Sequence, residues 1–184
     1  MKSAADKMTV EQFAQYAATH GSCELMHGEI RQLTPSGFEH GDITGRLHFY
    51  LAQHIIPNRL GKITVAETGF RFDEEQGPVV RAPDIAFVSA ERVPEILPQS
   101  FATFAPDLIV ETLSPTDAVS AVSEKIMWWM RHGVKEAWVA DPANQTLTLH
   151  WPDGLSRRYG MNQPVDGSKV LSGLTIDLQQ VFSS

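Results

Sequence analysis

Two short apolar runs, each with an acidic residue among its apolar side chains, place the strongest constraint on how this chain can fold. Residues 81–88 contain Asp84, and residues 106–115 contain Glu111. A carboxylate within a β-branched apolar run loses its hydration on folding, which is unfavourable unless a positive charge compensates it. Neither run carries an arginine placed to pair with both acids. The pattern therefore predicts two neighbouring buried strands whose acids share a divalent cation.

Side-chain alternation along a strand decides which of the acids can meet. Asp107 lies four residues before Glu111, roughly 13 Å away at a rise of about 3.3 Å per residue, so these two cannot bind one metal ion. We predict that Asp107, which follows Pro106, marks the entry of the strand. Asp84 and Glu111 can meet if their strands are adjacent. Taken alone, Asp84 is equally compatible with a turn acid at a strand edge.

A lysine follows the second acid on a predicted helix over residues 117–132. Lys125 flanks the apolar stripe of this helix, so its stem can be buried while its amine extends past the end of the sheet. Leu113 occupies the position two residues after Glu111, where a lysine completes the Glu-x-Lys pattern of metal nucleases. Lys125 would have to serve in its place. Considered alone, it would be an ordinary lysine on a helix surface.

The rest of the chain predicts an α+β, or mixed α/β, fold in a single domain spanning residues 1–184, with a loose tail at 1–8. Helix signals cover residues 9–18 and 39–56, and a β-hairpin over 23–33 turns at His27-Gly28. Further strands are predicted near residues 62–72, 83–88, 107–113 and 135–140. From residue 144 onward the pattern is typical of β-hairpins.

Composition bounds the compartment and the partners. Hydrophobic residues make up 42% of the 184, enough for a core. The N-terminus has no signal pattern, no apolar run approaches the length of a membrane span, and the single cysteine, Cys23, fits a reducing compartment. We therefore expect a cytoplasmic protein without a membrane partner. The net charge of −7 argues against tight nonspecific binding to duplex DNA but permits a local basic groove.

Three further polar residues have more than one interpretation. Glu24 is either a neighbour of the metal site or a solvent-facing strand residue. His40 begins a helix whose histidines match no zinc signature, so it either caps the helix or lines the site. Glu67 is expected to pair with Arg71 rather than to take part in a site.

Six segments of the chain, taken together, resemble a known family. They are CELMHGE at 23–29, EH at 39–40, PDIAFV at 83–88, PDLIVETLSP at 106–115, EK at 124–125 and GVKEAWVADP at 133–142. In this order they are similar to the Uma-two-type endonuclease family, a branch of the restriction-endonuclease-like PD-(D/E)XK superfamily. The resemblance covers residues 9 to about 155. It implies a central mixed sheet flanked by helices, with extra β-hairpins.

The resemblance also implies a metal-dependent endonuclease that acts on DNA. Its Mg²⁺ or Mn²⁺ would be held by Asp84 and Glu111, with the backbone carbonyl of Thr112 as a further ligand. Lys125 is the catalytic lysine, and Glu24 and His40 are additional catalytic candidates. The superfamily resemblance also supports a homodimer.

The chain departs from the family pattern in ways that favour an alternative function. Cys23 and Trp129 replace residues that are commonly tyrosine, and Ala121 stands where an acid often precedes the lysine. With the acidic net charge, these changes favour a non-catalytic binding or assembly module that keeps the nuclease fold. The two hypotheses differ in whether the site hydrolyses DNA.

Overall fold

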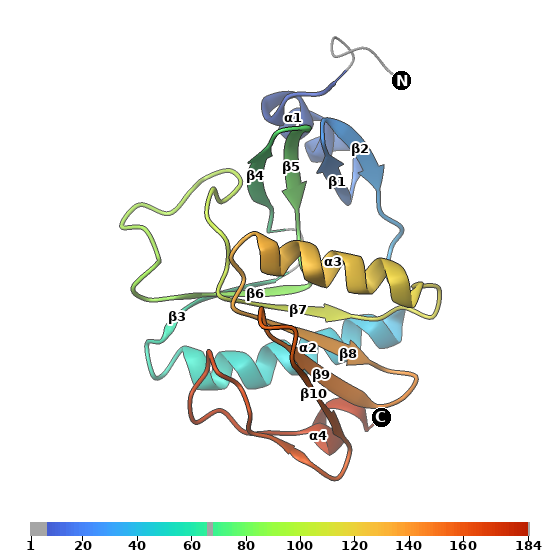
Figure 1. Cartoon of the computed structure of the whole chain (residues 1–184), viewed down its shortest axis with the longest axis vertical. Coiled ribbons are helices and arrows are strands. Elements are labelled where there is room, and N and C mark those ends of the chain that lie inside the picture. Colours follow the sequence, from blue (N-terminus) through green and yellow to red (C-terminus); the bar gives the residue numbers. More distant parts are fainter. Residues whose placement is uncertain (1–6, 66–67, 184) are drawn as a thin grey trace.

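A mixed β-sheet with helices on both faces forms the centre of the molecule (Figure 1). The computed structural model describes residues 7–65 and 68–183. The elements are α1 (Val10–His20), β1 (Cys23–Met26), β2 (Glu29–Gln32), α2 (Phe38–Ile55), β3 (Gly61–Val65), β4 (Phe70–Glu74), β5 (Gly77–Arg81), β6 (Ile85–Ser89), β7 (Leu108–Thr112), α3 (Val119–Arg131), β8 (Glu136–Asp141), β9 (Thr146–His150), β10 (Ser156–Gly160), β11 (Pro164–Val165), β12 (Ile176–Asp177) and α4 (Leu178–Phe182). The order β10-β9-β8-β7-β6-β3 makes the central sheet, and β2-β1-β5-β4 makes a second sheet. This α+β architecture confirms the predicted fold class.

The centre of the main sheet is apolar on both faces, because helices cover both. Ile85 and Val110 belong to the core cluster under α2, whereas Ala86 and Ile109 belong to the cluster under α3. This alternation along β6 and β7 is the one expected from the sequence. Strand β7 is antiparallel to β6 and parallel to β8, which it reaches through α3. A parallel connection of this kind requires a crossover, and α3 supplies it.

The rotation of α3 about its axis is fixed by aromatic side chains. Trp129 is fully buried and meets Phe70 of β4 edge-to-face, with ring centroids 6.1 Å apart. Trp128 meets Phe72 in the same way at 5.0 Å, and its indole Nε1 donates a hydrogen bond of 2.8 Å to Glu74. These contacts also attach α3 to the second sheet, which lies next to the helix in Figure 1. The second sheet therefore faces the same helix as the central sheet.

The structure contains several of the helix ends and turns that the sequence predicted. The N-terminus of α1 has a complete capping box between Thr9 and Gln12. The β1–β2 turn places His27 and Gly28 at positive φ, 53° and 82°, as a two-residue hairpin turn requires. Helix α3 ends before Gly133, whose φ of 99° suits a glycine that terminates a helix.

The predicted strand at 62–72 is wrong as a single element. The segment contributes β3 to the central sheet and β4 to the second sheet, where β4 pairs with β5. Strand β5 was missed because Gly77 and Pro78 at its start are residues typical of turns, although Pro78 precedes the apolar pair of Val79 and Val80. Glu67 lies outside the described residues. Its expected partner Arg71 contacts Asp73, at 3.1 Å.

The C-terminal part also departs from the prediction. The β9–β10 hairpin was expected, but in the described chain up to residue 183 it is followed by the short strands β11 and β12 and then by α4. Asp177 caps α4 by accepting a hydrogen bond from Gln179 N, a capping signal that the sequence interpretation overlooked. Apolar side chains of α4 pack against α2 within the core, so this segment closes one side of that helix.

The beginning of the described chain is attached to the second sheet. Met8 N donates a hydrogen bond of 2.8 Å to the carbonyl of Gly28 in the β1–β2 turn. Residues 1–6 of the predicted tail lie outside the described residues. Within residues 7–65 and 68–183, no helix combines the length and the apolar character needed to cross a bilayer.

Asp107 fixes the start of β7, at the opposite end of that strand from Glu111. It is 1% exposed, and its carboxylate contacts Ser89 N at 2.8 Å, Arg92 Nη1 at 2.7 Å and Lys135 Nζ at 2.8 Å. Burial opposes ionisation of this acid, but the contacts with Lys135, Ser89 and Arg92 outweigh it and lower the pKa of Asp107. The residue thus occupies the strand-entry position predicted for it and joins β6, β7 and β8.

Candidate active site

Asp84 and Glu111 face each other across the β6–β7 pair. Ile85 pairs with Val110, and continuing this antiparallel register by one residue puts Asp84 opposite Glu111. Asp84 lies in the bend before β6 rather than inside the strand. Its Oδ2 accepts a hydrogen bond of 2.7 Å from the backbone N–H of Thr112, which fixes the carboxylate against the end of β7.

Glu111 is buried and only half satisfied. Its Oε2 is 2.8 Å from Lys125 Nζ, whereas its Oε1 has no hydrogen-bond partner within the described chain. Burial raises the pKa of Glu111 to about 7, and the charges of Asp84 and Glu24 act in the same direction against the opposing effect of Lys125. Buried carboxylate oxygens are normally paired, so an unpaired one next to a second carboxylate indicates a place for a cation.

Lys125 extends from α3 to the end of the sheet. Its Nζ lies 2.8 Å from Glu111 Oε2 and 3.9 Å from Glu24 Oε1. Burial disfavours the ammonium form, but the carboxylates of Glu111 and Glu24 outweigh it and raise the pKa of Lys125. The structure therefore brings this lysine to the two acids, and the interpretation of Lys125 as an ordinary surface lysine is wrong.

Glu24 of β1 is the third acid at this point. It is 2% exposed, so its interpretation as a solvent-facing residue is wrong. Its Oε2 accepts a hydrogen bond of 3.3 Å from Arg81 Nε, and its Oε1 has no hydrogen-bond partner in the described residues. The Arg81 guanidinium also lies 4.9 Å from the centre of the Trp128 ring. The sequence did not identify Arg81 as a neighbour of the site, because β5 was not predicted. Side-chain alternation along β5 would have shown which face of the sheet Arg81 occupies.

His40 and Thr44 reach the site from α2. His40 Nε2 lies 3.3 Å from Asp84 Oδ2, and this hydrogen bond raises the pKa of His40. Thr44 Oγ1 donates a hydrogen bond of 2.8 Å to Thr112 Oγ1. Of the two interpretations of His40, site lining is therefore the one the geometry supports. Thr44 was missed, although its spacing of four residues from His40 puts both on one helix face.

Two hollows open at the acids. A cleft of about 620 Å³ lies on the Asp84 side and is lined by His40, Thr44 and the loop at 33–36. A smaller hollow of about 160 Å³ is lined by Glu24, Glu111 and Lys125 among others. The acids are thus accessible from two directions although their side chains are largely covered.

The residues present fit a hard divalent cation. Asp84 and Glu111 offer carboxylate oxygens, and the backbone carbonyl of Thr112, the residue after Glu111 on β7, would be a further ligand. Mg²⁺ is typically bound by one or two carboxylates together with water and substrate phosphate, so this small donor set suits it. Within residues 7–65 and 68–183, no group of three or more His, Cys, Asp or Glu side chains could hold a metal ion, so a cation at this point would have to take its other ligands from water and substrate.

Comparison with known proteins assigns the family. The model of the Uma2 family, described as "Putative restriction endonuclease", matches residues 10–179, so the chain belongs to this family. A solved structure from Anabaena variabilis ATCC 29413, described as a putative nuclease belonging to DUF820, is 23% identical and superposes with a TM-score of 0.81. The match covers 96% of this chain and 98% of that one, and it shows a shared fold. No curated protein matches the chain.

The raised pKa of Glu111 makes the stability of the metal-free protein depend on pH. A raised acid pKa stabilises the fold below the ordinary value of 4.5, and this contribution is lost as the pH rises through about 7. The variant Glu111→Gln keeps a neutral group of the same shape. In urea unfolding with a chelator, wild type should therefore lose more stability than Glu111→Gln between about pH 5 and pH 8. Parallel pH curves would contradict the assignment.

Proposed function

We propose that this protein is a metal-dependent endonuclease that hydrolyses DNA phosphodiester bonds with Mg²⁺ or Mn²⁺. The observation that carries the proposal is the facing of Asp84 and Glu111 across β6 and β7, with Lys125 Nζ 2.8 Å from Glu111. Membership of a restriction endonuclease family supports the same reaction class. The three residues come from a strand, a bend and a helix that the packed core holds in place, as a catalytic arrangement requires.

Asp84, Glu111 and the carbonyl of Thr112 would hold the cation. When bound there, it would supply Lewis-acid stabilisation of the negative charge that develops on the phosphate. The protein orients Asp84 through the N–H of Thr112 and through His40, at 2.7 Å and 3.3 Å from Oδ2. It orients Glu111 through Lys125. Each carboxylate thereby keeps one oxygen fixed by the protein.

Lys125 donates a hydrogen bond to Oε2 of Glu111, so its ammonium protons lie at the carboxylate whose other oxygen, Oε1, is unpaired. Its ammonium group is able to orient a water molecule or to stabilise charge on the phosphate as the bond to the leaving oxygen breaks. Glu24 helps to position this lysine, because its Oε1 is 3.9 Å from Lys125 Nζ. Arg81 in turn holds Glu24 in place by donating a hydrogen bond to its other oxygen. His40 holds a proton next to Asp84, so it belongs to the same catalytic group.

Removing either acid tests the metal pair. Asp84→Asn or Glu111→Gln should lower Mg²⁺-dependent nicking of supercoiled plasmid DNA by about 10²-fold or more, because a charged ligand is lost while the shape is kept. Asp73→Asn is the matched control, because Asp73 is an exposed acid on β4. Asp107→Asn is unsuitable, since it would leave Arg92 and Lys135 without their shared partner. Nicking at the wild-type rate in either site variant would remove that residue from the mechanism.

The role of Lys125 is tested by separating metal binding from cleavage. Lys125→Ala should keep the increase in melting temperature caused by Mn²⁺, since no metal ligand is lost, yet cleave about 10²-fold more slowly. Lys125→Arg should restore little activity, because a guanidinium does not release its proton near neutral pH. Full activity of Lys125→Ala would show that the lysine has only a structural role.

A non-catalytic module is the second candidate function, favoured by the net charge of −7 and by Ala121 at a position where an acid is common. Metal binding alone does not separate this module from a nuclease, so the test must measure both metal binding and DNA cleavage. If Mn²⁺ stabilises wild type but not Asp84→Ala, and no DNA is cut under any condition tested, the fold would serve binding rather than hydrolysis.

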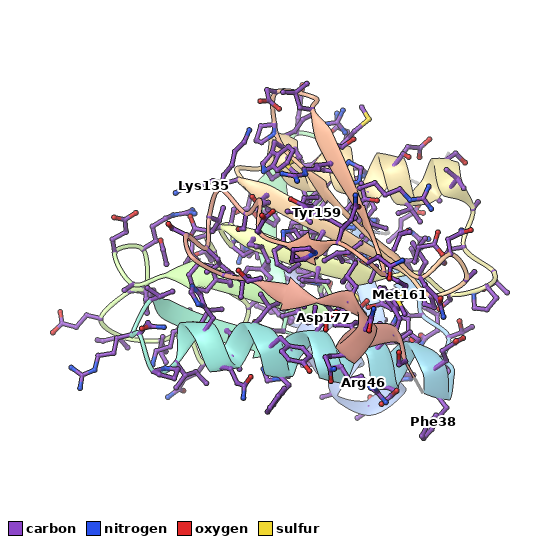
Figure 2. The ribbon with its side chains drawn as sticks, turned by 90° about the horizontal axis from the view of Figure 1, so that it is seen from below. Phe38, Arg46, Lys135, Tyr159, Met161 and Asp177 are labelled. Carbon is purple, nitrogen blue, oxygen red and sulfur yellow. The ribbon has the colours of Figure 1, made fainter. Side chains whose placement is uncertain are left out.

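We also propose that two copies assemble into a homodimer through the outer face of α2. Phe38, Phe49 and Ile56 are exposed at helical spacing along this face, and Phe38 is 94% exposed. Figure 2 shows Phe38 at the N-terminal end of α2, pointing away from the molecule. Exposed apolar stripes commonly mark interaction surfaces, and a two-fold pairing would also double the surface available for DNA.

Light scattering tests the dimer. Wild type at about 50 µM should have twice the mass of the chain, and Phe49→Glu should shift it to the monomer by placing a charge in the interface. Leu155→Glu, at an exposed apolar residue in the turn between β9 and β10, is the control and should stay dimeric. A monomeric wild type, or equal behaviour of both variants, would contradict the proposal.

A further inference from the structure

Arg31 is directed toward the candidate active site by strand register. It lies on β2, directly opposite Glu24 of β1, and opposed residues of an antiparallel pair project from the same face. The adjacent pair, Leu25 and Ile30, packs on the other side, in the core cluster with Phe13 of α1. The face that carries Glu24 and Arg31 is therefore the one turned toward α3.

The small hollow next to Glu111 has an unusual balance of charge. Its lining includes the acids Glu24, Glu111 and Asp117, and the cations Arg31 and Lys125. Glu24 Oε1 and Glu111 Oε1 are buried there without a hydrogen-bond partner in the described residues. A phosphodiester approaching this hollow would meet several negative charges, so its binding requires a cation that is free to contact it.

Arg31 is suited to that contact, whereas the neighbouring cations are engaged. Lys125 is held by Glu111 at 2.8 Å, and Arg81 is buried against Glu24 at 3.3 Å. Arg31 is exposed and forms no ion pair within residues 7–65 and 68–183. A guanidinium presents a planar set of donors that matches two phosphate oxygens at once.

We infer that Arg31 binds a backbone phosphate of the substrate strand at the mouth of this hollow and positions that strand over Asp84 and Glu111. The inference rests on the proposed nuclease function and adds a substrate-binding residue to it. Arg31 does not transfer protons, because a guanidinium keeps its proton throughout the working pH range. A local cation of this kind also explains how a chain with a net charge of −7 can bind a polyanion.

The experiment measures DNA binding separately from cleavage. Fluorescence anisotropy of a labelled duplex is recorded with Ca²⁺, over a range of salt concentrations, for wild type, Arg31→Ala and Arg31→Lys. Arg31→Ala should bind about 10-fold more weakly, with the slope of log affinity against log salt reduced by about one, because one phosphate contact is lost. Arg31→Lys should recover the slope but only part of the affinity. In cleavage assays KM should change more than kcat.

Arg59→Ala is the control, because Arg59 is an exposed arginine beyond the end of α2 that lines a different hollow. It should leave affinity and salt slope at wild-type values. The inference is overturned if Arg31→Ala keeps wild-type affinity and slope, or if Arg59→Ala changes both equally. Wild type that binds DNA in Ca²⁺ but does not cut it in Mg²⁺ would refute the nuclease proposal while the phosphate contact is still measured.

Discussion

The pairing of β6 with β7 is the constraint on which the rest of the candidate site depends. It buries apolar residues on both faces of the sheet and, one residue beyond the pairing, sets Asp84 opposite Glu111. Two carboxylates at such a position are unfavourable without compensation. The N–H of Thr112 compensates Asp84, and the ammonium of Lys125 compensates one oxygen of Glu111. The other oxygen of Glu111, Oε1, is left without a hydrogen-bond partner in the described residues. The site thus combines a rigid scaffold with an incomplete charge balance.

The second sheet completes this arrangement from the other side of α3. It supplies Glu24 and Arg81, and its aromatic residues pack on Trp128 and Trp129. Without it, Lys125 would have one acid partner instead of two, and α3 would lose the contacts that fix its rotation. The β1–β2 hairpin and the β4–β5 hairpin are therefore part of the site as well as of the fold.

Much of this could be predicted because the signals are local. The acid within each apolar run, the capping box of α1 and the Gly133 stop signal each follow from a few neighbouring residues. Strand β5 could not be recognised in this way, because Gly77 and Pro78 at its start are typical of turns and its identity as a strand depends on pairing with β1 and β4. Arg81 and Thr44 were missed because their partners in the site, Glu24 and Thr112, lie far away in the sequence.

Because the lysine of the site lies on α3, its position depends on the rotation of that helix about its axis. Leu113, two residues after Glu111, packs with the α3 core instead of carrying an amine. The amine is instead delivered by a helix, where each residue turns the side chain by about 100°. A slip of α3 by one residue would therefore carry Lys125 away from the acids while the helix remained a helix. The buried indole rings of Trp128 and Trp129, packed on Phe70 and Phe72, oppose such a rotation, so the residues that build the core also set the direction from which the amine reaches the acids.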